Sequence, residues 1–218
     1  MNQFQYQLPN DIERQSMATI GEELEQMGAV IPAENEAVVK RVIHTTADFD
    51  YAKNLVFTPQ AVARALSAMK EAPVIVTDTN MALAGINKTA LAQVGGEVRC
   101  FMADADVAES AKAKGTTRAT AAVDKAVSLF PGAIFVCGNA PTALIRLAQI
   151  MRDTDVRPAL IVGVPVGFVN VVESKEEILA LAEETGVPAI VARGRKGGSN
   201  VAAAICNALL YQAVGRRV

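Results

Sequence analysis

The 218-residue sequence contains no tryptophan, a single histidine and only three cysteines. Cys100, Cys137 and Cys206 lie far apart and form no C-x-x-C pair, which disfavours a disulfide framework and a structural zinc site. We therefore predict no metal site, and reduced thiols favour a cytoplasmic protein. The first residues have no basic segment followed by an apolar one, so no signal peptide is predicted.

Neither sign of charge dominates, and no hydrophobic run is long enough to span a bilayer. Lys and Arg number 21 against 23 Asp and Glu, which gives no basic surplus for a nucleic-acid partner. The longest apolar stretch, 158–172, is interrupted by Pro165, two glycines and Asn170, so no membrane association is predicted. Residues 1–36 carry seven acidic side chains against Arg14 alone, and we interpret them as a solvated helix face.

Aliphatic side chains are abundant, since 51% of the residues are hydrophobic but only 5% are aromatic. Short strand-like runs alternate with helical segments after residue 73, and several runs are apolar throughout, as in parallel strands buried on both faces. The predicted strands are 74–76, 97–101, 133–137, 159–162 and 189–191. The helices that follow them are 104–113, 118–129, 141–152, 174–185 and 199–213. The pattern predicts one α/β domain, residues 1–218, with a five-stranded parallel sheet between helix layers.

Three further helices are predicted ahead of the sheet. Asn10 is a candidate N-cap for a helix that ends near Gly28. Pro32 opens a second helix, and Thr58 followed by a proline starts a third that runs to about Glu71.

Ligand sites in such sheets lie beyond the carboxyl ends of the strands, where residues 193–199 form the most specific local signal. Three cations alternate with three glycines at a strand-to-helix turn. Backbone N–H groups, a helix N-terminus, Arg195 and Lys196 suit phosphates or carboxylates. The order matches neither a Walker A loop nor G-x-G-x-x-G, and the alternative interpretation is a solvated basic turn.

Two other helix starts carry polar residues. In the turn 138–142, Asn139 can cap a helix whose first position is Pro141, and capping alone would explain both. Thr117 can cap the helix that begins at Arg118. A cation in a first helical turn opposes the helix dipole, which indicates that Arg118 binds an anion.

His44 is the one side chain here that ordinarily titrates near neutral pH. Arg41 lies on the same helix face, and Thr45 and Asp48 follow closely. A lone histidine is more often structural than catalytic, and no Ser–His–Asp order is present. The residues alone thus describe a site for a large polyanion with one acid–base group.

Four blocks of the sequence resemble, in order, motifs of the precorrin-8X methylmutase family, and the resemblance extends from Ile12 to Leu210. The blocks are 41–51, 138–144, 162–169 together with 173–175, and 194–199. The family acts in the corrin branch of vitamin B12 synthesis and moves a methyl group from C-11 to C-12 of the macrocycle. The resemblance implies a flavodoxin-like fold, a homodimer and no added cofactor.

The resemblance also implies residue roles. His44 matches the family's proton donor or acceptor, and Ser16, Arg41, Thr117 and Arg118 match substrate contacts. The full set of substrate-binding residues predicted from the loops and the resemblance is Ser16, Arg41, Thr45, Asp48, Thr79, Thr117, Arg118, Asn139, Thr142, Arg195, Lys196, Gly197, Gly198 and Ser199.

The segment 45–50 resembles members of the anaerobic pathway, in which cobalt is already in the ring, and favours cobalt-precorrin-8 over metal-free precorrin-8X. The cobalt would belong to the corrinoid substrate. Apolar cover for the macrocycle is predicted from Met81, Val164, Val166 and Phe168. Two alternatives stay open, a non-catalytic tetrapyrrole carrier and a nucleotide-binding α/β protein that uses residues 193–199 for phosphates.

Overall fold

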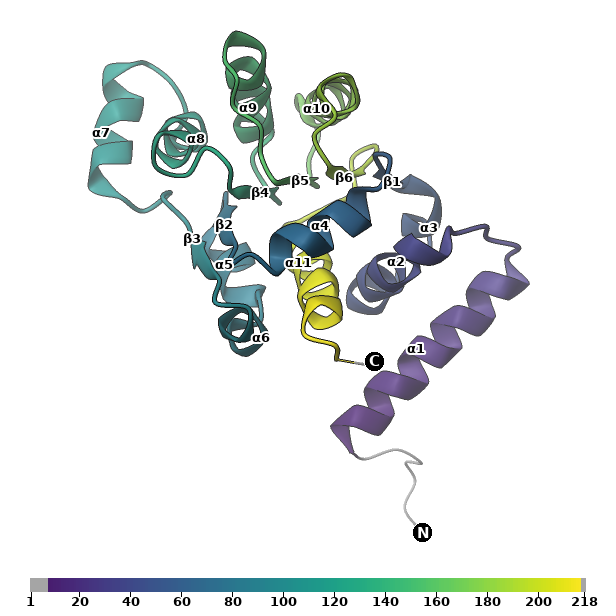
Figure 1. The fold of residues 1–218 in the computed structure, drawn as a ribbon. Helices are drawn as coiled ribbons and strands as arrows, with labels where there is room; N and C mark the ends of the chain where they lie inside the picture. Colours follow the sequence, from purple (N-terminus) through teal and green to yellow (C-terminus); the bar gives the residue numbers. More distant parts are fainter. Residues whose placement is uncertain (1–7, 217–218) are drawn as a thin grey trace.

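The computed structural model describes residues 8–216, and six strands within them form one sheet (Figure 1). In spatial order the strands are β1 (Leu55–Phe57), β6 (Ala189–Ala192), β5 (Leu160–Gly163), β4 (Ile134–Cys137), β2 (Val74–Thr77) and β3 (Glu97–Arg99). The five predicted strands are present and parallel, in the order of flavodoxin-like sheets. The prediction of no signal peptide rests on residues outside the described range.

The sixth strand, β1, was not predicted, and it pairs antiparallel with β6 at the edge of the sheet. Only three residues form it, too few to show an alternating pattern. Its continuation is held by Thr58, whose Oγ1 accepts a hydrogen bond from the Ala189 N–H at 2.9 Å. The formation of β1 therefore depends on its pairing with β6 and not on a local sequence pattern.

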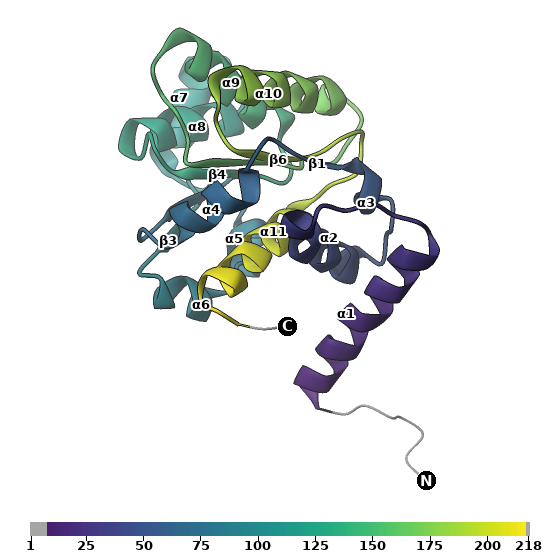
Figure 2. The same ribbon diagram turned by 45° about the vertical axis from the view of Figure 1, so that its right-hand side comes forward.

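The helices cover both faces of the sheet, as Figures 1 and 2 show. One face packs against α8 (Arg118–Leu129), α9 (Pro141–Asp153) and α10 (Val171–Thr185), and α7 (Ala105–Ala113) packs against α8. The other packs against α2 (Ala33–Thr46), α3 (Tyr51–Asn54), α4 (Ala61–Met69), α5 (Asn80–Gly85), α6 (Lys88–Gln93) and α11 (Ser199–Ala213). Helix α1 (Pro9–Gln26) lies outside these layers against α2. No helix among residues 8–216 is long and apolar enough to cross a membrane.

The central strands are buried on both faces because their side chains alternate between two cores. Ile134 and Leu160 join the core on the α11 side, whereas Phe135 and Ile161 join the core beneath α9 and α10. Full burial of each such aliphatic side chain contributes about 1.5–3 kcal/mol. Helix α11 is apolar on most of its surface because it runs inside the first core.

Three predicted caps are wrong. Helix α1 begins at Pro9 with Leu8 at its N-cap position, so Asn10 lies inside the helix. Helix α4 begins at Ala61 rather than directly after Thr58, because Thr58 is engaged with β6. Asn139 does not cap α9 either, since the N-cap residue is Ala140 and has no side-chain cap.

The backbone at the start of α9 is bound instead by Asp78, which follows β2. Its Oδ1 accepts from the N–H of Gly138 at 2.8 Å, and its Oδ2 accepts from those of Asn139 and Ala140 at 2.8 and 2.7 Å. The carboxylate is buried, so it occupies the turn in the way a bound anion would. Asp78 therefore joins the carboxyl ends of β2 and β4.

Asp78→Asn should lower the free energy of unfolding by about 1–3 kcal/mol, because one carboxylate oxygen becomes an NH2 group facing a backbone N–H. Urea denaturation measures this loss. The matched control is Asp155→Asn, at an exposed position with no hydrogen-bond partner among residues 8–216, where the change should stay within about 0.5 kcal/mol. Equal losses in the two variants would refute the anchoring role of Asp78.

Candidate functional site

Residues 193–199 form a glycine loop between β6 and α11 that is folded against the turn after β5. Gly194 and Gly198 have φ values of +77° and +133°, which side chains other than glycine rarely allow. A Cβ at Gly197 would lie 2.1 Å from the Val164 carbonyl oxygen. The Gly198 N–H donates to that same oxygen at 2.9 Å. These glycines are thus required by close backbone packing.

The structure brings several predicted site residues together in pairs. The hydroxyls of Thr79 and Ser199 lie 2.8 Å apart and share a hydrogen bond. The hydroxyl of Thr117, which also caps α8 as predicted, donates to that of Thr142 at 3.0 Å. Two polar pairs at the carboxyl edge of the sheet thus combine residues that follow β2, β4 and β6 with the residue that caps α8.

His44 occupies the last turn of α2, where its side chain is exposed. The chain leaves this helix through Ala47 in a left-handed conformation, with φ of 53°. Asp48 and Asp50 in the following turn both accept from Lys196 Nζ, at 2.7 and 2.6 Å. This contact places the histidine's turn beside the glycine loop, 146 residues or more away in sequence.

The same contact affects the ionisation of Asp48 and Lys196. The hydrogen bond from Lys196 lowers the pKa of Asp48. In return, the hydrogen bonds to Asp48 and Asp50 raise the pKa of Lys196, so the pair stays ionised around neutral pH. Because two carboxylates already balance its charge, Lys196 links the two segments instead of offering a free cation.

Two other predicted cations have no carboxylate partner within residues 8–216, namely Arg118 and Arg195. Arg118 is exposed in the first turn of α8. The guanidinium of Arg195 lies over the Phe168 ring, 5.4 Å from its centroid, where the aromatic face stabilises the cation. In contrast, Arg193 pairs with Glu176 at 3.1 Å. Arg118 and Arg195 are therefore two predicted cations at this edge that remain available to an anionic ligand.

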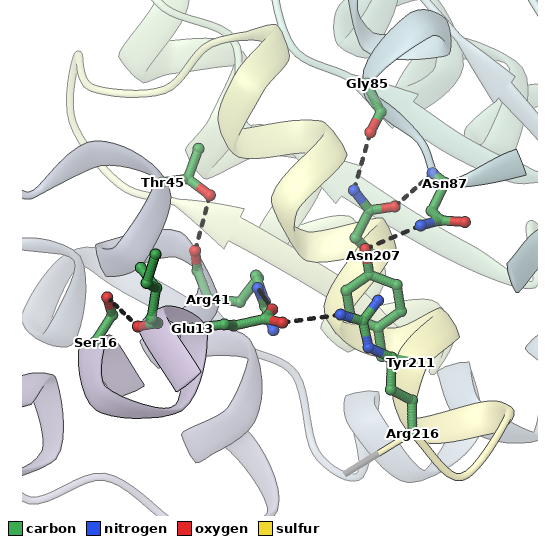
Figure 3. Close-up of polar contacts among 10 residues, drawn as sticks. Glu13, Ser16, Arg41, Thr45, Gly85, Asn87, Asn207, Tyr211 and Arg216 are labelled. Atoms are coloured by element: carbon green, nitrogen blue, oxygen red, sulfur yellow. Dashed lines mark hydrogen bonds and ion pairs between the residues drawn. The ribbon is translucent and has the colours of Figure 1, made fainter. Parts of the chain in front are cut away.

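Ser16 and Arg41 lie elsewhere, at the junction of α1, α2 and α11 (Figure 3). Arg41 Nη1 donates to Glu13 Oε1 at 2.6 Å, and its guanidinium faces the Tyr211 ring at 5.2 Å. The Ser16 hydroxyl donates to the Ile12 carbonyl within its own helix. Thr45 likewise donates to the Arg41 carbonyl. Neither Ser16 nor Arg41 hydrogen-bonds to the glycine loop.

A hollow of about 310 Å³ at this junction is lined by cations, but all of them are paired. Lys40 pairs with Glu36, and both Arg41 and Arg216 pair with Glu13. Burial opposes the ionisation of Glu13, but the two guanidinium groups outweigh it and lower the pKa of this carboxyl. The positive charges that line the hollow are therefore balanced by carboxylates of the chain without a ligand.

The exposed apolar side chains at the carboxyl edge partly match the predicted ring cover. Met81, Val166 and Phe168 are exposed, at 72%, 47% and 83% of their surface. Val164 is wrong as a cover residue because it is fully buried and belongs to the core on the α11 side.

Sequence reasoning missed three residues that shape this site: Asp78, Asp50 and Lys175. An acidic residue directly after a strand, as at Asp78, is the kind of signal that could have indicated an anchor. The matched blocks 41–51 and 173–175 contain Asp50 and Lys175 but predict no role for either, because the burial of Lys175 depends on the loop folded above it. No group of three or more His, Cys, Asp or Glu side chains in residues 8–216 could hold a metal ion.

Comparison with known proteins gives one family. The family model described as "CbiC: Precorrin-8X methylmutase" matches residues 11–212. The chain is 51% identical over 178 residues to a cobalt-precorrin-8 methylmutase of Salmonella typhimurium, covering 81% of each chain. It is 46% identical over 208 residues to one of Leptospira interrogans, covering 93% of each. A crystal structure of precorrin-8X methyl mutase from Thermus thermophilus superposes with a TM-score of 0.83 at 38% identity, covering 95% of this chain and 99% of that one.

Lys196→Met should raise the pKa of Asp48 toward its ordinary value, because the variant removes the hydrogen bond that lowers it. The Asp48–Lys196 pair stabilises the fold above the pKa of an unfolded aspartate, and this contribution is lost as the pH falls through the folded-state pKa. NMR titration of the Asp48 carboxyl carbon measures the shift. Lys53→Met, which removes an exposed lysine without a carboxylate contact, should leave the Asp48 midpoint in place. An unmoved midpoint in Lys196→Met would show that the contact does not form in solution.

Proposed function

The chain belongs to the precorrin-8X methylmutase family and is an isomerase of cobalamin biosynthesis, and we propose that it moves the C-11 methyl group of cobalt-precorrin-8 to C-12, giving cobyrinate. One observation carries the proposal for the site. The contact of Lys196 with Asp48 and Asp50 places the turn of His44 against the glycine loop. Arg195 in the same loop has no carboxylate partner within residues 8–216.

In this proposal, His44 is the proton donor or acceptor. The methyl group breaks its bond to one ring carbon and forms a bond to the next, so reactant and product have the same composition. No oxidant, reductant or added cofactor is needed for that balance, and cobalt enters as part of the substrate. A proton placed on the macrocycle by His44 assists the shift, and one acid–base group is sufficient for this.

Arg118 and Arg195 bind acetate and propionate carboxylates of the substrate. Guanidinium groups form paired, charge-assisted hydrogen bonds with carboxylates and so fix both position and orientation. Met81, Val166 and Phe168 supply apolar cover for the ring, consistent with their exposure at the same edge. The hydroxyls of Thr79, Thr117, Thr142 and Ser199, the side chain of Asn139 and the backbone of Gly197 and Gly198 complete the polar lining.

Cobalt-precorrin-8 is preferred to metal-free precorrin-8X as the substrate. The segment 45–50 resembles that of the anaerobic pathway, and the two relatives at 51% and 46% identity carry cobalt-precorrin-8 in their names. The Thermus protein, at 38% identity, is named for precorrin-8X.

We also propose a cytoplasmic homodimer. Helix α1 contacts mainly α2 and extends away from the other layers (Figures 1 and 2). It exposes Leu8 and Ile12 on its first turns, at 66% and 45% of their surface. A second copy of the chain would bury these side chains. Since α1 carries Ser16 and contacts Arg41 through Glu13, a site at the subunit interface would bring both residues near a substrate.

The proposed activity is tested by anaerobic incubation of the purified protein with cobalt-precorrin-8 and, in parallel, precorrin-8X. A changed visible spectrum at unchanged product mass is expected, with faster turnover of the cobalt substrate. A ligand that binds without change would support the carrier alternative. Binding of ATP or a dinucleotide with no corrinoid binding would support the nucleotide alternative.

His44→Ala should reduce turnover by about 10²–10⁴-fold because it removes the proton donor, while substrate affinity stays within a few-fold of the wild-type value. Single-turnover rates and a spectroscopic binding titration separate the two quantities. Added imidazole should restore part of the rate in this variant. Near wild-type turnover would eliminate His44 as the acid–base group.

Arg118→Ala and Arg195→Ala should each weaken binding of the carboxylated substrate by about tenfold, since each removes one charge-assisted contact. The control is Arg193→Ala in the same loop, whose guanidinium is engaged by Glu176 and whose loss should change affinity about twofold at most. Equal substrate affinities in all three variants would argue against Arg118 and Arg195 as ligands of the substrate carboxylates.

A further inference from the structure

Lys175 is the most deeply buried charged side chain of residues 8–216, with 0% of its surface exposed. It lies in the second turn of α10, directly beneath the glycine loop. Its Nζ donates to the carbonyl oxygens of Gly194 and Lys196, both at 2.8 Å. No carboxylate lies within ion-pair distance of it in this part of the chain.

A buried ammonium is costly, and a methionine of similar shape would fill the same space without that cost. The cost of burying the Lys175 ammonium is therefore offset by the hydrogen bonds that it donates. The two carbonyl groups that it engages belong to the residues on either side of Arg195. The Arg195 carbonyl is bound as well, by the Gly167 N–H at 3.3 Å. Three successive carbonyls are thus hydrogen-bonded, those of Gly194 and Lys196 to the buried ammonium, so this part of the loop is held in place.

We propose that Lys175 is a positioning residue, whose buried ammonium holds the glycine loop so that Arg195 meets a substrate carboxylate and Lys196 stays joined to the turn of His44. The proposal rests on the proposed function for its substrate and on the two hydrogen bonds for its geometry. Lys175 itself contacts no substrate, because the loop separates it from the surface.

Because Lys175 titrates, its positioning role predicts a measurable pH dependence of substrate binding. The titratable and charged groups around it are Cys137 on β4, Glu176 on its own helix, and Arg193, Arg195 and Lys196 in the loop. Burial lowers the pKa of Lys175 to about 8, and the opposing effects of Cys137 and Glu176 are smaller. Above that pH the charge-assisted bonds become neutral ones, so the loop is held less firmly and KM should rise.

Stability should respond in the opposite sense. Because the folded-state pKa lies below the ordinary value of 10.5, the unfolded chain binds more protons between these two pH values. The contribution of Lys175 to the free energy of unfolding therefore increases with pH across that range. A purely structural lysine would not combine rising stability with weakening substrate binding.

The test compares Lys175→Met with Lys88→Met. Lys88 also donates to two backbone carbonyls, those of Leu83 and Ile86, and burial also lowers its pKa, but it lies away from the loop. We expect Lys175→Met to raise KM about tenfold with kcat nearly unchanged and to abolish the rise of KM above pH 8. Lys88→Met should keep the wild-type KM and pH profile. An unchanged KM in folded Lys175→Met would overturn the proposal.

Two further measurements can also overturn the proposal. If Lys175→Met does not fold, the pH profile of Arg195→Ala replaces it, since that variant should lose the rise of KM above pH 8 and retention of the rise would overturn the proposal. Hydrogen exchange of the amides of residues 194–198 needs no substrate. The protection factors of these amides, which correct for the base-catalysed rise of the intrinsic exchange rate, should fall in the wild type above pH 8. Constant protection factors would overturn the proposal even if no corrinoid is turned over.

Discussion

The carboxylate of Asp78 is the constraint from which the arrangement of the carboxyl edge follows. By accepting three backbone N–H groups at residues 138–140, it uses the anion-binding capacity of the turn before α9. The turn is thereby fixed against α11, where a Cβ at Gly138 would lie 2.8 Å from the Ser199 Cα atom. In the proposed function, an external anion is bound at the neighbouring glycine loop and at α8, where Arg195 and Arg118 have no carboxylate partner within residues 8–216.

The cations near this edge are divided between internal and external partners. Arg193 and Lys196 bind carboxylates of the chain, and Lys175 binds carbonyls, whereas Arg118 and Arg195 have no carboxylate partner in the described part of the chain. This division explains how a chain with a net charge of −2 can serve a substrate with several carboxylates. Local placement of two unpaired guanidinium groups is what recognition requires, and a global basic surplus would add only non-specific attraction.

Features with a local cause were predictable from the sequence. All five parallel strands were predicted, and α8 and α11 have the predicted bounds, with α8 capped locally by Thr117. Features that depend on distant partners were not predictable. Strand β1 exists through its pairing with β6, Asn139 loses its capping role to Asp78, and Arg41 is engaged by Glu13 on a helix 28 residues earlier. Whether each cation is free or paired also depends on distant partners, so it was not predictable from the sequence.

The linkage between His44 and the glycine loop has a chemical consequence. A methyl group that moves between adjacent ring carbons demands that the macrocycle be held in register to within about a bond length of the proton donor. Arg195, which would hold a carboxylate, and Lys196, which holds the turn of His44 through Asp48, are neighbours in the chain. Since the carbonyls of Gly194 and Lys196 are both bound by Lys175, the anchor for the substrate and the anchor for the acid–base group share one rigid segment. Their relative position is thus set by a single peptide unit, and in the proposed mechanism this shared segment directs the rearrangement.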